Sequence, residues 1–232
     1  MAASMQDKHV LDARVPSGRA KSINTLADKA YHIIEEMIVT LELPPGSIIS
    51  EVKLSDQINV GRTPLREALQ RLAKEKLVAV LPRRGMIVSN VNILDQLEVI
   101  ELRRVVDRLL VSKAVARANS EQRQRLKKIA CEIGIAASDG NIQEFMHLDA
   151  ELDQIIQLAS RNFFAGQISE TLHAHCRRFW FMNQAGSDLV RSAELHAEMM
   201  NAISEGDKED AVEASDRLSD YIEDFTRSAL DR

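Results

Sequence analysis

Residues 61–72 read Gly-Arg-Thr-Pro-Leu-Arg-Glu-Ala-Leu-Gln-Arg-Leu, and this stretch decides the fold of a chain of 232 residues. Its apolar residues recur at the spacing of one helix face, which predicts an amphipathic helix; they are Leu65, Ala68, Leu69 and Leu72. Thr63 is a candidate N-cap, and Pro64 would stand at the first helical position. The first turn of this helix would then carry Arg62, Thr63 and Arg66 on its outer face.

A second, shorter helix and a tight turn precede this stretch. Ser50 would cap the shorter helix, which carries Leu54 and Ile58, and Asn59 would end it in the left-handed conformation. Two helices joined by a tight turn over residues 59–61 form a helix-turn-helix.

Two short β-rich runs follow the helices. Val78 and Val80 lie in the first run and Ile87 and Val88 in the second, with a basic turn over residues 81–86 between them. A hairpin this small is not stable by itself, so the helices must cover it.

An amphipathic helix completes this part of the chain. It begins at Asn24 or Thr25 and is ended by Pro44-Pro45-Gly46. Its apolar face is formed by Ala30, Ile33, Ile34, Met37, Ile38 and Leu41. We therefore expect a winged helix-turn-helix domain over residues 23–90, preceded by a mobile tail over residues 1–22.

The sequence pattern changes after Asn90. Strand signals stop, and long segments with apolar residues at helical spacing alternate with short polar breaks. We expect helices at about residues 93–117, 120–138, 141–159, 163–184, 188–205 and 207–230. Short breaks favour antiparallel neighbours, so residues 91–232 predict an all-α antiparallel helical bundle. The predicted fold class is therefore mainly α.

The positive charge of the chain is concentrated in one region. The formal net charge is −5, which argues against general binding of polyanions. Residues 1–90 contain 13 Lys and Arg against 10 Asp and Glu, whereas residues 91–232 contain 17 against 25. Between Arg62 and Arg84 there are seven basic and two acidic side chains. This segment is the one expected to face phosphates.

Several other function classes are disfavoured. Cys131 and Cys176 lie far apart, which favours free thiols in a reducing compartment, and His173 and His175 are not expected to form a chelating pair. No secretory signal is present, and no apolar run has the ~20 residues of a membrane span. No nucleophile–base arrangement or phosphate-binding loop is evident. We expect a cytoplasmic protein that has no membrane segment. We do not expect it to be an enzyme.

The helix over residues 61–72 has the chemistry for reading DNA. The guanidinium groups of Arg62 and Arg66 match the O6 and N7 acceptors of guanine, while Thr63 and the first-turn amides suit a phosphate oxygen. Arg84, next to Gly85 at the hairpin tip, suits a narrow minor groove. For any one helix a solvated basic surface is the alternative, but the order of helix, turn, helix and basic hairpin favours DNA.

Residues 26–90 resemble the DNA-binding domain of GntR-family bacterial transcription regulators. The resemblance rests on residues 61–69, Leu72, Arg84-Gly85, Pro44-Pro45-Gly46 and Leu54. It implies that an operator is contacted by Arg62, Thr63, Arg66 and Gly85. Where many relatives have another arginine this chain has Val52, so Lys53 is expected to take over that contact.

Residues 92–230 resemble the FadR-type effector domain, called FCD, of the same family. The motifs are Glu101-x-Arg103-x-x-x-Asp107, Phe145-x-x-x-Asp149, Asn162, Glu194-Leu195-His196 and Ala202-Ile203-x-x-Gly206-Asp207. In many relatives one Asp and three His residues hold a divalent metal. Asp149 and His196 stand at two of these positions, and Asp153 and Leu218 at the other two. The resemblance thus implies an incomplete site for Zn, Ni or Mn.

Asp149 and Asp153 would share one helix face, where two carboxylates repel each other unless a cation lies between them. Arg103, Arg177 and Arg178 are candidates for that cation, or for clamping a carboxylate ligand. We therefore expect an effector site, with or without a metal at Asp149 and His196, formed by Arg103, Asp149, Asp153, Arg177 and His196.

The leading hypothesis from these resemblances is a transcription regulator that binds a pseudo-palindromic double-stranded operator as a homodimer. A small-molecule effector, by resemblance an organic acid, would bind the helical domain and shift the placement of the DNA-binding domains through residues 90–95. Two alternatives remain open. One is a metal-dependent hydrolase that uses the helical cavity, and the other is a DNA-binding regulator whose sensor cavity is vestigial.

Overall fold

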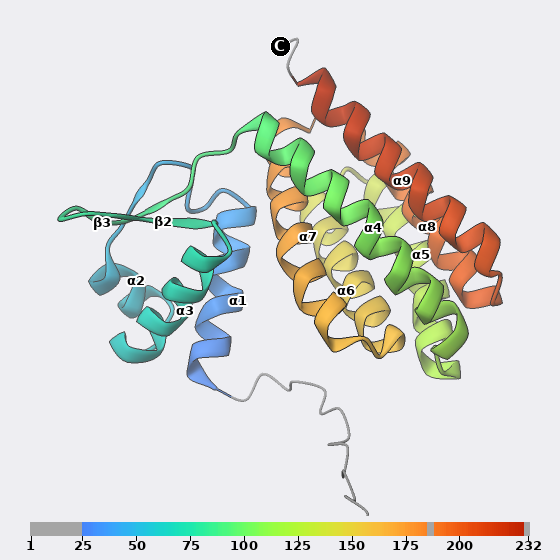
Figure 1. Cartoon of the computed structure of the whole chain (residues 1–232), viewed down its shortest axis with the longest axis horizontal. Helices are drawn as coiled ribbons and strands as arrows, with labels where there is room; N and C mark the ends of the chain where they lie inside the picture. Colours follow the sequence, from blue (N-terminus) through green and yellow to red (C-terminus); the bar gives the residue numbers. More distant parts are fainter. Residues whose placement is uncertain (1–24, 185–187, 230–232) are drawn as a thin grey trace, which may run out of the picture.

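The computed structural model describes residues 25–184 and 188–229, and within these ranges it contains nine helices and three strands. A small domain that carries the sheet lies beside a larger bundle of helices (Figure 1). The predicted mainly-α class, with a winged helix-turn-helix followed by an all-α bundle, is confirmed. The predicted tail over residues 1–22 lies outside the described residues.

Helix α1 (Leu26–Val39) packs against α3 of the small domain and against α7 of the bundle. Thr25 caps it, because the amide of Asp28 donates to the Thr25 Oγ1 atom at 3.0 Å. The helix ends at Val39, before the Pro44-Pro45-Gly46 segment that was predicted to end it. The reason is Leu41, whose φ of 61° is left-handed and cannot continue the helix.

The helix-turn-helix consists of α2 (Glu51–Gln57) and α3 (Arg62–Lys74). Ser50 caps α2, and Asn59 adopts a φ of 51° at the turn, as predicted. The predicted N-cap at Thr63 and first helical position at Pro64 are wrong, because α3 begins two residues earlier, at Arg62, and its N-cap is Gly61. The inner face of α3 is buried as predicted, through Leu65, Ala68, Leu69 and Leu72.

The sheet has three strands in the order β1-β3-β2, and both pairings are antiparallel. Strands β2 (Val78–Leu81) and β3 (Gly85–Val88) form the predicted hairpin, but its turn is shorter than residues 81–86 because Leu81 pairs with Gly85. Strand β1 (Ile48–Ile49) was not predicted, since two residues leave no readable alternation.

Six helices form the bundle: α4 (Ile93–Arg117), α5 (Ser120–Ser138), α6 (Ile142–Ser160), α7 (Phe163–Asn183), α8 (Asp188–Glu205) and α9 (Lys208–Ser228). Every predicted helix is present, with ends that differ by no more than two residues. Polar caps explain this accuracy, because side chains at the predicted breaks accept first-turn amides; they are Asn92, Asn119, Asn141, Asn162 and Asp207.

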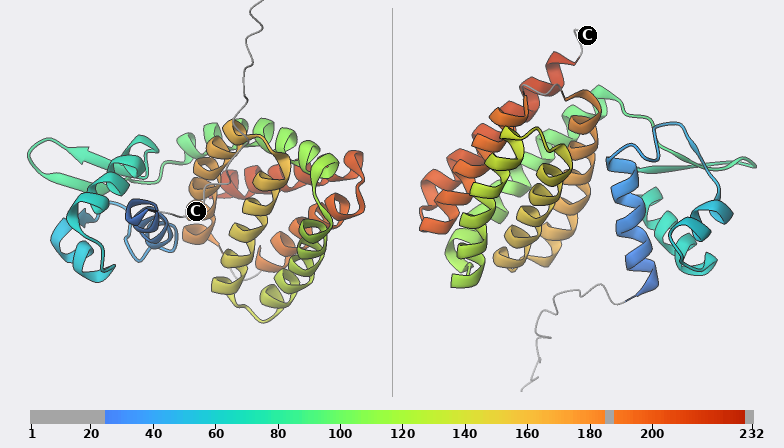
Figure 2. Two further views of the ribbon diagram at one scale, coloured as in Figure 1. Left: turned by 90° about the horizontal axis from the view of Figure 1, so that it is seen from below. Right: turned by 180° about the vertical axis from the view of Figure 1, so that it is seen from behind.

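Within the bundle, α4 packs against α6, α7 and α9, while α5 packs against α6 and α8. The two views of Figure 2 show α1 running alongside α7, so α7 belongs to the bundle and also faces the small domain. Residues 89–92 form a short connection between β3 and α4. The two domains are therefore joined by this short connection and by the α1–α7 contact.

Candidate nucleic-acid interface and effector site

The N-terminal end of α3 is open to solvent. Arg62, Thr63 and Arg66 are all exposed there, and Lys53 is exposed on α2. No side chain caps this end of α3, so its first-turn amides remain available to an anion. These exposed positions are compatible with the predicted phosphate and base contacts.

Arg66 has a partner that the sequence did not indicate. Its Nε atom donates to the Oε2 atom of Glu51 on α2 at 2.7 Å, although 62% of the Arg66 side chain is exposed. An exposed pair of this kind contributes about 0–1 kcal/mol. Arg66 can therefore leave Glu51 at little cost.

The hairpin tip projects from the small domain (Figure 1). Arg83 and Arg84 are exposed in the turn between β2 and β3. Gly85 has a φ of +86°, a conformation that favours glycine, and no atom lies within 4 Å of a Cβ built there. The backbone conformation therefore explains why glycine stands at position 85. The missing side chain also leaves room for another molecule to approach closely.

A cluster of buried ionisable side chains lies inside the bundle. It brings together four helices. Six of its members are less than one-tenth exposed, and the seventh, Arg177, forms ion pairs with two of them. The cluster consists of Arg103 and Asp107 on α4, Asp149 and Asp153 on α6, His173 and Arg177 on α7, and His196 on α8. All five residues predicted for the effector site belong to it.

Asp149 and Asp153 face the same cation. The Nη1 atom of Arg177 lies 2.5 Å from Asp153 Oδ2 and 3.5 Å from Asp149 Oδ2. Asp149 also contacts the Nε2 atom of His196 at 2.9 Å. Burial by itself would raise the pKa of Asp149, but His196 and then Arg177 outweigh it and lower that pKa. Asp149 is therefore held in its ionised form.

His173 is a central member of the cluster that the sequence did not single out. Its Nε2 atom lies 2.8 Å from Asp107 Oδ1, and its Nδ1 atom forms an ion pair with Asp153 that lacks hydrogen-bond alignment. Burial and Arg103 would lower the pKa of His173, but Asp107 and Asp153 outweigh them and raise it to about 8. His173 is thus poised to carry a proton near neutral pH.

The role expected for Arg103 differs from the one observed. Arg103 donates to Asp107 at 2.9 Å one turn away on α4, whereas Arg177 is the partner of the two carboxylates on α6. Asp107 and His173 are therefore members of the site that sequence reasoning missed. The available signals were the i, i+4 pair of Arg103 with Asp107 and the matching spacing of His173 and Arg177 on α7.

The donor set does not fit a divalent metal. Leu218 lines the cluster at the place of one expected imidazole, and Arg177 already supplies positive charge between Asp149 and Asp153. Among the residues that the structure describes, no group of three or more His, Cys, Asp and Glu side chains could hold a metal ion. We therefore assign no step to a metal.

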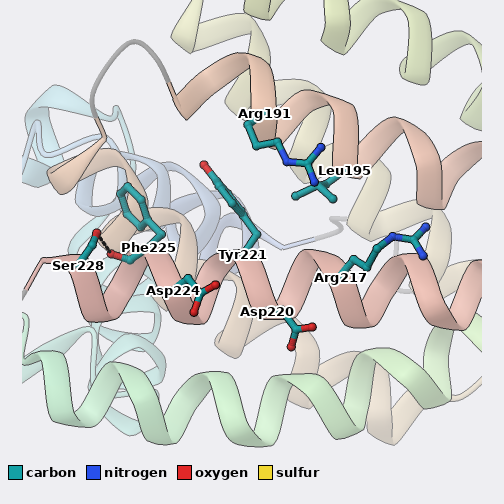
Figure 3. A pocket seen from close by; sticks show the side chains of 8 residues that line it. All are labelled: Arg191, Leu195, Arg217, Asp220, Tyr221, Asp224, Phe225 and Ser228. Carbon is teal, nitrogen blue, oxygen red and sulfur yellow. Dashed lines mark hydrogen bonds between the residues drawn. The ribbon is translucent and has the colours of Figure 1, made fainter.

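Two hollows differ in size and chemistry. The space within the buried cluster is only ≈ 10 Å³, about enough for one water molecule. A groove of ≈ 480 Å³ lies between α8 and α9, lined by Arg191, Leu195, Arg217, Asp220, Phe225 and Ser228 among others (Figure 3). Its charged groups are paired locally, for example Arg191 with Glu194 at 3.1 Å. The cluster, rather than the groove, holds the predicted effector residues.

A winged helix-turn-helix with exposed arginines at its reading helix, joined to a helical domain with a buried polar cluster, defines a DNA-binding transcription regulator. Comparison with known families agrees with this class. Residues 26–88 match the family described as bacterial regulatory proteins, gntR family, and residues 98–220 match the FCD domain. The chain belongs to the gntR family of bacterial regulators and carries an FCD domain.

Individual relatives carry corresponding names. The chain is 25% identical over 202 residues to the HTH-type transcriptional repressor RspR of Escherichia coli, covering 85% of this chain and 86% of RspR. It is 30% identical over 179 residues to an HTH-type regulator of Streptomyces ambofaciens, covering 76% and 75%. The solved structure of E. coli McbR/YncC has the same fold, with a TM-score of 0.77 at 16% identity over 89% of this chain and 99% of McbR/YncC.

None of the described helices is long and apolar enough to cross a membrane.

Proposed function

We propose that a small organic acid controls the operator binding of this regulator by entering the buried cluster of the FCD domain. The observation that carries this proposal is the position of α7. Its residues His173 and Arg177 belong to the cluster, and other residues of the same helix hold the DNA-binding domain. A change at the cluster therefore has a direct route to the reading helix.

Three side chains of α7 contact the DNA-binding domain. Glu170 forms an ion pair with Arg71 of α3 at 3.2 Å, and the His175 Nε2 atom donates to the carbonyl of Glu75 at 2.8 Å. Arg178, which is almost fully buried, donates to the carbonyl of Ser89 at the start of the connection to α4. These contacts tie α7 to the end of α3 and to the interdomain connection.

The size of the cluster cavity supports a conformational response. A space of ≈ 10 Å³ cannot hold an organic acid, so a ligand must displace side chains or separate helices. The carboxylate of the ligand would replace Asp153 on the guanidinium of Arg177, which is a bidentate partner for such groups. Because the ligand then binds only the opened arrangement, it shifts the equilibrium toward that arrangement.

The same proposal includes a homodimer on a pseudo-palindromic operator, since two-fold related reading helices match two inverted half-sites. The hydrolase alternative gains no support from the cluster, because Arg or His side chains contact each of its three carboxylates. The alternative of a vestigial sensor predicts operator affinity that no ligand changes.

The experiment measures operator affinity against a panel of small mono- and dicarboxylic acids, with native mass spectrometry of the purified protein to identify a retained ligand. We expect at least one acid to change the affinity about tenfold, equivalent to ~1.4 kcal/mol of coupling. Arg177→Lys, which keeps the buried positive charge but cannot bind a carboxylate bidentately, should weaken the response strongly while leaving DNA binding without ligand, and Arg191→Met should retain the response. An Arg177→Lys variant that responds fully would refute the assigned site.

A further inference from the structure

Helix α1 carries a buried carboxylate at the boundary between the two domains. Glu35 is only 9% exposed, because α1 packs against α7 of the bundle as well as against its own domain. The Oε2 atom of Glu35 lies 3.6 Å from the Nδ1 atom of His32. Its Oε1 atom is buried and has no hydrogen-bond partner among the residues that the structure describes. Since a buried carboxylate is costly unless it is paired, Glu35 needs a further cation nearby.

The packing of α1 on α7 brings Glu35 to the level of Arg177. At one end of this contact, Arg71 of α3 lies 3.8 Å from Asp28 of α1 and 3.2 Å from Glu170 of α7. The two helices run side by side in the same direction (Figure 1). Glu35 follows Asp28 by seven residues, which is about two helical turns. Arg177 follows Glu170 by the same number, so both side chains lie on the faces where α1 and α7 meet.

The charge of Glu35 acts on Arg177 across the domain boundary. Burial would lower the pKa of the Arg177 guanidinium, but the two carboxylates of α6 and then Glu35 outweigh it and raise that pKa. Arg177 therefore attracts carboxylates from two domains: two from the effector cluster and one from the DNA-binding domain. The three interdomain contacts of α7 described above differ from this one, because they involve no member of the cluster.

We propose that Glu35 is the positioning residue that links the charge of the effector cluster to the placement of the DNA-binding domain. Without ligand, attraction to the guanidinium of Arg177 holds Glu35, and with it α1, against α7. A ligand carboxylate on Arg177 adds a negative charge close to Glu35 in the protein interior, where charges interact more strongly than in water. Glu35 is then repelled, and the docked placement of α1 loses stability relative to other placements.

The role of Glu35 rests on the proposed function for the nature of the ligand, and it explains how the ligand acts. A ligand shifts an equilibrium only if it interacts differently with the two states. Glu35 supplies this difference, because it meets the ligand at short range only while α1 is docked on α7. By the same linkage, removing the carboxylate of Glu35 removes a repulsion and should not weaken ligand binding.

The first experiment needs no ligand and measures the coupling of Glu35 to the cluster by double-mutant cycles in denaturant unfolding. With Arg177→Met, Glu35 loses its cation, so Glu35→Gln should be about tenfold more favourable for the folding equilibrium than it is in wild type. With Asp153→Asn, a competing carboxylate is gone, so Glu35→Gln should be more costly than in wild type. The second background supplies the test if Arg177→Met does not fold.

Glu36→Gln is the matched control for these cycles. Glu36 is the next residue of α1, and its side chain is exposed. Its effect should be the same in wild type and in both backgrounds. If the effects of Glu35→Gln are additive to within about twofold in the backgrounds that fold, Glu35 is not linked to the cluster and the proposal is overturned.

The second experiment measures operator affinity with the panel of mono- and dicarboxylic acids, and acid binding by calorimetry. The acid with the largest effect on wild type should bind Glu35→Gln at least as tightly. Its effect on operator affinity should nevertheless fall from about tenfold to less than about twofold, whereas Glu36→Gln should respond like wild type.

The two experiments separate the role of Glu35 from the proposed function. An undiminished response of operator affinity in Glu35→Gln would overturn the role of Glu35 and leave the proposed function standing. If the cycles show coupling but no acid binds or changes operator affinity, the proposed function fails, and the charge link between the two domains stands.

Discussion

One guanidinium bridges two carboxylates in the core of the FCD domain: the Nη1 atom of Arg177 lies 2.5 Å from Oδ2 of Asp153 and 3.5 Å from Oδ2 of Asp149. Asp149 and Asp153 are one turn apart on α6 and are both buried. Two such carboxylates stay ionised together only if a cation lies between them. The chain supplies this cation from α7, the helix that also contacts the DNA-binding domain.

Replacing Arg177 should therefore destabilise the fold strongly. We expect Arg177→Met to lower the free energy of unfolding by roughly 3–5 kcal/mol, because two buried carboxylates lose their counter-ion. Arg191→Met is the control, since Arg191 is 55% exposed and pairs with Glu194 on the surface, where a pair contributes about 0–1 kcal/mol. Denaturant titration measures both, and equal small losses would contradict the bridging role.

The metal content of the purified protein also tests whether Arg177, rather than a metal ion, supplies the positive charge between Asp149 and Asp153. We expect no stoichiometric Zn, Ni or Mn in the wild-type chain, and no change in melting temperature on chelation. The Asp153→His/Leu218→His variant installs the two missing imidazoles and should gain metal-dependent stability. One equivalent of metal in the wild type that disappears in His196→Ala would show that Arg177 does not replace the metal.

The stability of the domain should fall as the pH rises through the pKa of His173. That pKa is raised from 6.5 to about 8, so the folded state binds the proton more tightly than the unfolded chain does. The resulting stabilisation is fully present below pH 6.5 and is lost toward pH 8 and above; it is on the order of 2 kcal/mol.

The His173→Gln variant should lose this pH dependence. His32, whose pKa is also raised through its contact with Glu35, titrates in both proteins, so the difference between them isolates His173. Denaturant unfolding between pH 6 and 9 measures the effect. If wild type and variant change in parallel over this range, His173 does not carry the proton.

Recognition of DNA should depend on Arg66 more than on other basic residues of α3. We expect Arg66→Ala to weaken operator binding by about 1–3 kcal/mol and to relax the base preference at one position of each half-site. Lys74→Ala, at the exposed C-terminal end of the same helix, is the control and should have little effect. Unchanged discrimination between operators in Arg66→Ala would refute a base contact.

The elements of the fold were predictable where local chemistry decides them. Asn119 and Asn162 cap helices at the breaks where the sequence places them, and the spacing of Leu65, Leu69 and Leu72 identifies the buried face of α3. The two-residue strand β1 was not predictable, because it is defined by its pairing with β3, some 40 positions later in the chain.

The partners within the buried cluster were less predictable than its members. The five expected residues meet, but the sequence could not show that Arg177 rather than Arg103 reaches Asp153, because this depends on how α6 and α7 pack. His173 was set aside because its spacing to His175 excludes chelation by that pair. Its actual partners, Asp107 and Asp153, come from two other helices.

We propose above all that α3 and the wing of this regulator read a specific two-fold operator. Selection of bound fragments from a random double-stranded DNA library tests it most directly. Wild type should enrich two inverted half-sites, and the Arg62→Ala/Arg66→Ala variant should enrich neither while remaining folded. Absence of any enriched sequence with wild type, or the same half-sites with the double variant, would contradict the claim.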